Sequence, residues 1–286
     1  MKPMDTLKDN LHRHVKTLSV DIGERHMWRD GSLGRAAEYI EGEFAAIGYE
    51  PRRQTYSAYK KTVANIIAEQ PGPPGPILVI GAHYDTVPGS PGADDNTSAV
   101  AGLLELARLL RNTQANRPII FVAFVNEESP CYGSAKMGSM NHASLLKEKG
   151  TEVELMVCLE MIGYFNKDQR QEYPIPGMGL FYPKFADFIA VAANPPSAWH
   201  GGKLARGIRK GSDINARLLV APEQIGGINR SDNFAYWKHG YRAVMVTDTA
   251  NFRNHNYHQE TDTIDTLDFD SMAEVVKGLH ATLASF

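Results

Sequence analysis

Four apolar runs along the chain have the length and composition of buried β-strands. They are rich in β-branched residues and cover residues 76–81, 118–125, 153–159 and 241–247. Nearly continuous apolar character is typical of strands that helices cover on both faces, as in a mostly parallel sheet. Two further segments, residues 52–57 and 62–69, have the pattern of antiparallel edge strands.

Apolar residues at helical spacing predict the elements around these strands. A first helix carries Leu7, Leu11, Val15 and Leu18 at this spacing. Further helices are predicted over residues 36–47, 98–111, 134–149 and 268–285. This pattern predicts an α/β fold: a three-layer α/β/α sandwich around a mixed, mostly parallel sheet. Because the chain contains no internal repeat and no low-complexity linker, we expect residues 1–286 to form a single domain.

In two longer segments the apolar residues follow neither a helical nor a strand spacing. Residues 164–183 are rich in proline, glycine and tyrosine, and residues 201–221 are basic and contain glycine. Long irregular segments in a compact domain are often loops at a substrate site, and we expect this of both.

Charge and cysteine content narrow the classes of function. The formal net charge is -3 and the chain has no basic run, which argues against nucleic acid or an anionic membrane as its main partner. Charged residues interrupt the first twenty positions, so no apolar stretch there resembles a secretion signal or a membrane span, and the expected location is the cytoplasm. The two cysteines, Cys131 and Cys158, exclude a disulfide framework.

Side chains that bind metals follow the apolar runs. The candidates are two imidazoles and four carboxylates: His83, Asp94, Glu127, Glu128, Glu160 and His258. Each has an ordinary explanation when taken alone, since a lone histidine usually lies in the core or on the surface and an aspartate in a glycine-rich loop usually caps a turn.

Their common placement favours a metal site. The carboxyl ends of parallel strands meet at one edge of a sheet, so these groups should converge in one cleft, where a cation would offset the cost of crowding their charges. Asp85 lies two residues after His83 and is the natural acceptor for the second N–H of that imidazole. A pair of zinc ions needs such a set of ligands.

The order of the motifs resembles the M28 family of zinc exopeptidases, which includes bacterial leucyl-type aminopeptidases and is related to the glutaminyl cyclases. The motifs are HxD at 83–85, GADDN at 92–96 before a long helix, the glutamate pair at 127–128 followed by Gly133 and Ser134, LEMIG at 159–163, Ser231-Asp232, and H-x-x-x-D-T from His258. The resemblance covers about residues 65–268.

The resemblance implies a role for each candidate. Asp94 would bridge two zinc ions. His83 and Glu160 would complete one zinc site, and Glu128 and His258 the other. Glu127 would be the general base, and Asp85 would support His83. The resemblance also implies a cis peptide bond between Asp94 and Asp95.

Some positions depart from the family pattern or go beyond it. Asn233 stands where the family commonly has histidine, and Ile228 stands where some members have a tyrosine that steadies the oxyanion. Arg230, Asn229 or another side chain would have to supply that donor. Asp248 is expected beside the site, either recognising the substrate ammonium or serving as a cap or a salt-bridge partner of Arg253.

These inferences predict a metal-dependent aminopeptidase that removes the N-terminal residue from peptides with a free N-terminus. Two zinc ions would activate a water molecule, and Glu127 would take its proton and pass it to the leaving amine. One alternative is a single-zinc enzyme of the glutaminyl cyclase type, which would form pyroglutamate. Another is a non-catalytic binding domain on the same scaffold. The sequence leaves open the preferred residue, the metal used in the cell and the oligomeric state.

Overall fold

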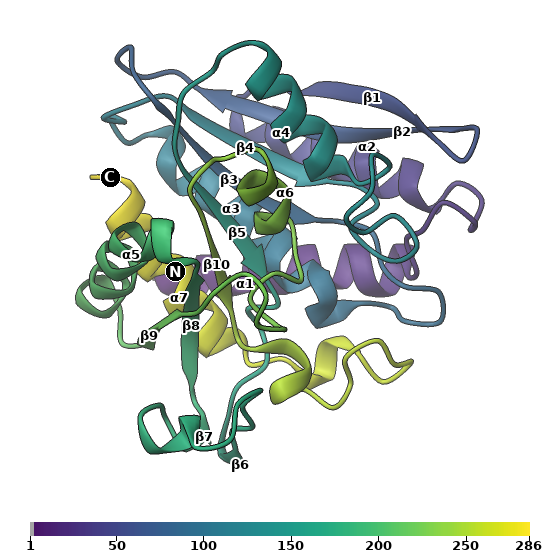
Figure 1. Ribbon diagram of the computed structural model, residues 1–286. Coiled ribbons are helices and arrows are strands. Elements are labelled where there is room, and N and C mark those ends of the chain that lie inside the picture. Colours follow the sequence, from purple (N-terminus) through teal and green to yellow (C-terminus); the bar gives the residue numbers. More distant parts are fainter. Residues whose placement is uncertain (1–2) are drawn as a thin grey trace.

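The computed structural model describes residues 3–286, in which eight strands form one mixed sheet (Figure 1). Across the sheet their order is β1-β2-β4-β3-β5-β10-β8-β9. Their bounds are β1 Arg52–Ala58, β2 Lys61–Gln70, β3 Ile77–His83, β4 Ile119–Phe124, β5 Val153–Glu160, β8 Phe188–Ala193, β9 Asn215–Val220 and β10 Ala243–Thr247. The central strands β4, β3, β5 and β10 run parallel to one another, which confirms the predicted mixed sheet with a parallel centre.

Helices cover both faces of this sheet (Figure 1). One face packs against α1 Pro3–Val15, α2 Ser32–Ile47, α3 Ala99–Arg111, α5 Ala198–Gly211 and α7 Phe269–Leu283. The other face packs against α4 Gly138–Glu148 and α6 Asn233–Lys238. The three layers were predicted from sequence because β3 and β10 are buried along their whole length, as their apolar runs require.

The structure corrects some expectations about single elements. The segment 201–221, expected to be a substrate loop, consists mainly of α5 and β9. Strand β2 is not an edge strand, because it lies between β1 and β4 and pairs with both. Strand β8 was not predicted. It lies between β10 and β9 in the sheet.

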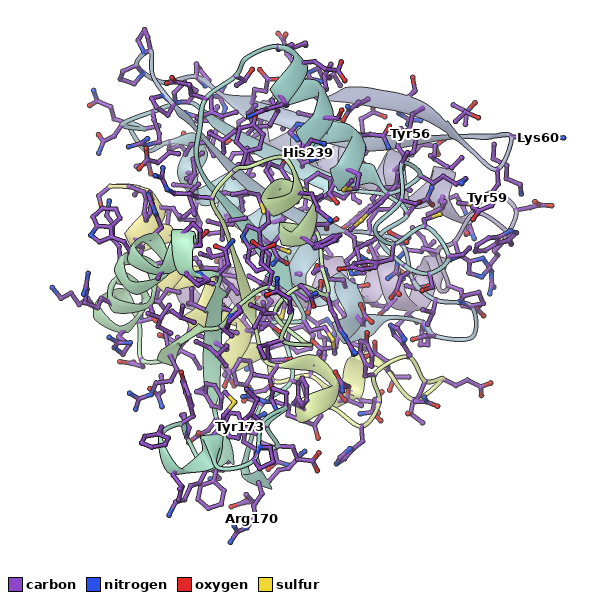
Figure 2. The ribbon with its side chains drawn as sticks, viewed as in Figure 1. Tyr56, Tyr59, Lys60, Arg170, Tyr173 and His239 are labelled. Atoms are coloured by element: carbon purple, nitrogen blue, oxygen red, sulfur yellow. The ribbon has the colours of Figure 1, made fainter. Side chains whose placement is uncertain are left out.

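The segment 164–183, expected to be irregular, contains one short strand within mostly irregular backbone and belongs to an insert between β5 and β8. The insert contains β6 Asn166–Arg170 and β7 Phe185–Ala186, which pair with each other away from the main sheet (Figure 1). Figure 2 shows Arg170 and Tyr173 of this insert well separated from Tyr59 and Lys60, which mark the turn between β1 and β2. Across residues 3–286, no helix combines the length and the apolar character that crossing a bilayer requires.

Candidate metal centre

The predicted ligands come from elements that end at one edge of the sheet. His83 is the last residue of β3, and Glu160 is the last residue of β5. Glu127 and Glu128 follow β4 directly, and His258 lies in the loop between β10 and α7. Parallel strands that neighbour each other bring their carboxyl ends together, so residues far apart in sequence become neighbours in space.

Two groups of metal-binding side chains share one carboxylate, that of Asp95. In the first group, His83 Nε2 lies 3.4 Å from Asp95 Oδ1 and 3.4 Å from Glu160 Oε2. In the second, His258 Nε2 lies 3.1 Å from Asp95 Oδ2 and 3.0 Å from Glu128 Oε1. Asp95 therefore directs one oxygen to each group.

Asp94 was predicted to be the shared carboxylate, and the structure corrects this by one residue. Asp94 Oδ1 accepts a hydrogen bond from the Gly163 N–H at 3.0 Å, and Asp94 Oδ2 accepts one from Asn254 Nδ2 at 2.8 Å. Its side chain thus points away from His83 and His258. The expected cis peptide also moves by one residue, since the cis bond joins Asp95 to Asn96 rather than Asp94 to Asp95.

Backbone hydrogen bonds fix the position of the two neighbouring aspartates. The N–H groups of Asp94 and Asp95 donate to the two carboxylate oxygens of Asp262, at 2.9 and 3.0 Å. Asp262, the aspartate of the H-x-x-x-D-T motif, therefore fixes the backbone of the pair. With the backbone fixed, the two successive side chains point to different sides of the loop.

A second carboxylate holds the glutamate pair in the same manner. Asp85 accepts hydrogen bonds from the N–H groups of Glu127 and Glu128, both at 3.1 Å. The predicted contact with His83 is made by the Asp85 backbone carbonyl, which lies 3.1 Å from His83 Nδ1, whereas the carboxylate oxygen is 3.7 Å away. Asp85 thus orients three site residues at once, by two different groups of its own.

Glu160 is also held by two neighbours from recognised motifs to which the sequence assigned no contact. Ser231 Oγ donates to Glu160 Oε2 at 2.6 Å, and Asn96 Nδ2 lies 3.2 Å from the same oxygen. Such neighbours orient a ligand before the metal binds. Ser231 was part of a recognised motif, but its contact with Glu160 had no local signal in the sequence.

The cluster carries more negative charge than its imidazoles can offset. Burial alone would lower the pKa of His83, but Glu160 and Glu127 outweigh burial and raise this pKa well above its ordinary value. Burial, with Asp95 adding to it, raises the pKa of Glu128 to about 7. Burial also raises the pKa of Glu127 well above its ordinary value. Crowded buried carboxylates of this kind are stabilised by a bound cation.

Unpaired polar atoms show that the residues fit a metal. Among the described residues, His83 Nε2, Asp95 Oδ1 and Glu127 Oε1 are buried and have no hydrogen-bond partner. Buried polar atoms normally have hydrogen-bond partners, so three unpaired atoms in one cluster indicate a binding site for a ligand such as a metal ion. Imidazole nitrogen and carboxylate oxygen are the donors that zinc prefers at hydrolytic sites. The ligand atoms of each group lie within 4.8 Å of one another.

The structure gives different results for the two predicted substrate residues. Asp248 is fully buried, and its carboxylate accepts hydrogen bonds from the N–H groups of Tyr164 and Ala250 at 3.0 and 2.9 Å. These bonds are those of a capping carboxylate, while recognition of a substrate ammonium by Asp248 stays a prediction. Arg230 is exposed and lines a pocket that adjoins Glu160.

The two departures from the family pattern occupy buried positions. Ile228 is buried in the core cluster that α4 and α6 cover. Asn233 is fully buried and donates from Nδ2 to the Ile228 carbonyl at 2.8 Å. These two residues thus hold the start of α6 and its preceding loop together.

The pocket beside Glu160 has a volume of about 280 Å³ and a mostly apolar lining. Ala190 and Ala192 of β8 and Met245 of β10 contribute to it from the sheet. Ile175 and Met178 contribute from the insert between β5 and β8. The expectation that segment 164–183 forms a loop at this site agrees with these positions.

Comparison with known proteins defines the class. A model of peptidase family M28 matches residues 65–283, the part of the chain that contains all the candidate ligands. With the metal-binding groups described above, this match defines a metallopeptidase. The chain belongs to peptidase family M28.

Other proteins share the sequence or the fold of this chain. The uncharacterized protein YfbL of Escherichia coli is 37% identical over 97% of this chain and 88% of its own length. The zinc aminopeptidase BSAP from Bacillus subtilis has a TM-score of 0.76 at 15% identity, over 95% of this chain and 94% of that one. A glutaminyl cyclase from Bacteroides thetaiotaomicron has a TM-score of 0.74 at 17% identity, over 98% of both chains. At these identities the two structures show a shared fold.

Proposed function

We propose that this protein is a two-zinc aminopeptidase that removes the N-terminal residue from peptides with a free N-terminus. The observation that carries the proposal is the position of Asp95, which directs one carboxylate oxygen to each of two groups of metal-binding side chains. A carboxylate shared in this way is suited to hold two ions side by side.

The residues divide into two proposed ligand sets. His83, Asp95 and Glu160 would hold one ion, and Asp95, Glu128 and His258 would hold the other. When bound, zinc polarises the scissile carbonyl and lowers the pKa of water toward neutrality. The first set is deeply buried, whereas the His258 side chain is 32% exposed, so the second set lies on the solvent side.

Glu127 is the remaining carboxylate and is proposed as the general base. It is buried, and Oε2 lies 3.9 Å from His83 Nε2. The Asp85 carboxylate fixes its backbone. A glutamate held in this position can take a proton from the attacking water and return it to the leaving amine.

The apolar pocket supports a preference for a large apolar N-terminal residue. It adjoins Glu160 of the buried ligand set, so a side chain in the pocket would bring its own carbonyl to the metal-binding groups. Alanines on β8 leave room at the base of the pocket, and residues of the insert close its outer wall. An apolar lining gives little partner for a glutamine amide, which favours hydrolysis over glutaminyl cyclisation.

A peptide panel with the metal restored tests this proposal. The protein is stripped with a chelator, reloaded with zinc, and incubated with one peptide sequence that begins with leucine, glycine or glutamine. A fourth peptide begins with N-acetyl-leucine. Mass spectrometry identifies each product.

We expect free leucine from the first peptide, slower release of glycine, and no cleavage of the acetylated peptide. The glutamine peptide should lose its whole first residue. Loss of ammonia from that peptide would identify a cyclase instead. Equal cleavage of the acetylated peptide would contradict an aminopeptidase, and no reaction in any reloaded sample would favour a binding domain.

A further inference from the structure

Arg25 lies far from the metal-binding residues in sequence and outside the segment 65–283 that matches the family. It follows η1 Lys16–Ile22 and precedes α2, yet its side chain is fully buried. A buried guanidinium is costly unless its donors are paired, so its contacts indicate what it stabilises. These contacts reach the two chain segments that carry the proposed metal ligands His83 and Asp95.

The first loop follows β3 directly after His83, the last residue of that strand, and contains Asp85. Arg25 Nε donates to the Tyr84 carbonyl at 2.8 Å, and the Arg25 backbone N–H donates to Thr86 Oγ1 at 3.0 Å. The Thr86 N–H in turn donates to the Arg25 carbonyl at 2.8 Å. Arg25 therefore bonds to the residues on both sides of Asp85.

The second loop leads into α3 and contains Asp95. Arg25 Nη2 donates to Thr97 Oγ1 at 2.7 Å and lies 3.1 Å from the Gly92 carbonyl, while Nη1 donates to the Pro91 carbonyl at 2.8 Å. These partners lie before and after Asp95 in the chain. One planar group thus sets the spacing between the loops of His83 and Asp95.

The chemistry of the guanidinium suits this task. Its five N–H donors form a rigid fork, and here they meet acceptors in several directions. Two further acceptors, the Leu18 and Gly23 carbonyls, lie 2.9 and 2.8 Å from Nη1 and anchor the group to η1. A lysine ammonium has three donors on a flexible stem and cannot replace this geometry.

We propose that Arg25 is a positioning residue of the metal centre, which holds the His83 and Asp95 loops at the separation that zinc binding requires. This inference rests on the proposed function only in assuming that the cluster binds metal. It assigns part of the site to the N-terminal segment, which would otherwise serve only to cover the sheet.

The test compares the zinc affinity of Arg25→Lys with that of a matched control, Arg117→Lys. Arg117 also donates to backbone carbonyls, those of Pro76 and Phe286. Pro76 precedes β3, so it lies at the amino end of that strand, whereas His83 lies at the carboxyl end. Zinc affinity is measured by competition with a chromogenic chelator, without peptide. Urea unfolding of the zinc-free proteins reports the stability of each variant.

We expect Arg25→Lys to lower zinc affinity about 10- to 100-fold, the range for residues that orient metal ligands. Arg117→Lys should keep zinc affinity within about twofold, whatever its effect on stability, because its contacts do not reach a ligand loop. Wild-type zinc affinity in folded Arg25→Lys would overturn the proposal. An equal loss of affinity in both variants would overturn it as well, since the effect would then be one of general stability.

A milder variant decides the matter if Arg25→Lys fails to fold. Thr97→Val removes one acceptor of Arg25 Nη2 and leaves the arginine in place. It should lower zinc affinity about tenfold or more, because it removes a hydrogen bond to a charged group and also the one that Thr97 Oγ1 donates to the Gly92 carbonyl. Wild-type affinity in that variant would overturn the proposal. If the wild-type protein itself binds no zinc, the proposed function fails at that step, before Arg25 is tested.

Discussion

Replacing Glu127 by glutamine tests the proposed division of labour between two neighbouring glutamates. Glutamine keeps the size and polarity of the side chain but cannot accept a proton. The Glu127 carboxylate is buried, and its backbone hydrogen bond to Asp85 does not depend on the side chain. The substitution should therefore leave the backbone and the proposed ligands in place.

The expected loss follows from the role of the group. Loss of a general base typically lowers turnover by a factor of about 10² to 10⁴. This corresponds to about 2.7 to 5.4 kcal/mol of transition-state stabilisation, at about 1.36 kcal/mol per tenfold change. Glu127 forms a third group with His83 and Glu128 but belongs to neither of the two groups that share Asp95. Because both of those groups keep all their members in this variant, zinc content should stay near that of the wild type.

Glu128→Gln is the matched comparison, one residue further along the same loop. Glu128 Oε1 lies 3.0 Å from His258 Nε2 in the solvent-side group, so this substitution should weaken zinc binding first. Its activity should recover in part with excess zinc. Zinc per chain by atomic absorption and turnover on a leucyl peptide are measured for both variants. Near-wild-type turnover in Glu127→Gln would refute the assignment, and exchanged phenotypes would reverse it.

Three further predictions test other parts of the account. Asp95→Asn should lower the zinc content of the protein far more than Asp94→Asn, and the opposite order in atomic absorption would restore the original assignment. The Tyr257 ring stacks on His258 and lines the pocket, and burial raises its pKa, so it stays a hydrogen-bond donor. Tyr257→Phe should lower turnover about 100-fold with zinc content unchanged if its hydroxyl steadies the oxyanion; unchanged turnover excludes that role. Burial lowers the pKa of His142 to about 3, so below about pH 6.5 the unfolded chain binds a proton that the folded chain does not. The zinc-free wild type should therefore lose about 2 kcal/mol more unfolding free energy than His142→Gln between pH 6.5 and 4.5, and parallel losses in urea titrations would contradict this.

The sequence predicted the central sheet and most of the site for one physical reason. Buried parallel strands must be apolar along their length, and their carboxyl ends converge, so polar residues just after such runs become neighbours. His83, Glu127, Glu128 and Glu160 all follow this rule. This rule cannot decide between Asp94 and Asp95, because the two residues are adjacent and have the same side chain. The contacts that separate them come from Gly163 and Asn254, far along the chain, which bind the Asp94 carboxylate.

Long-range packing also explains the errors in the fold. Glycines in segment 201–221 lower helix propensity and favoured a loop. In α5, however, they let the helix approach α7, since a Cβ at Gly207 would lie 2.4 Å from Thr282 and one at Gly211 would lie 2.6 Å from Ala281 Cβ. The role of Arg25 could not be predicted from the sequence near it either, because its partners in the two ligand loops are backbone carbonyls and threonine hydroxyls about 60 to 70 residues further along the chain. Contacts of this kind depend on the complete fold.

Titrating the zinc-free protein with zinc, while following release of the first residue from a leucyl peptide, tests the central claim most directly. Free leucine and zinc per chain are measured in the same samples. The account predicts negligible activity without metal and a rate that rises until two zinc ions are bound to each chain, with free leucine as the product. Full activity in the zinc-free protein, or no release of leucine at any zinc concentration, would contradict it.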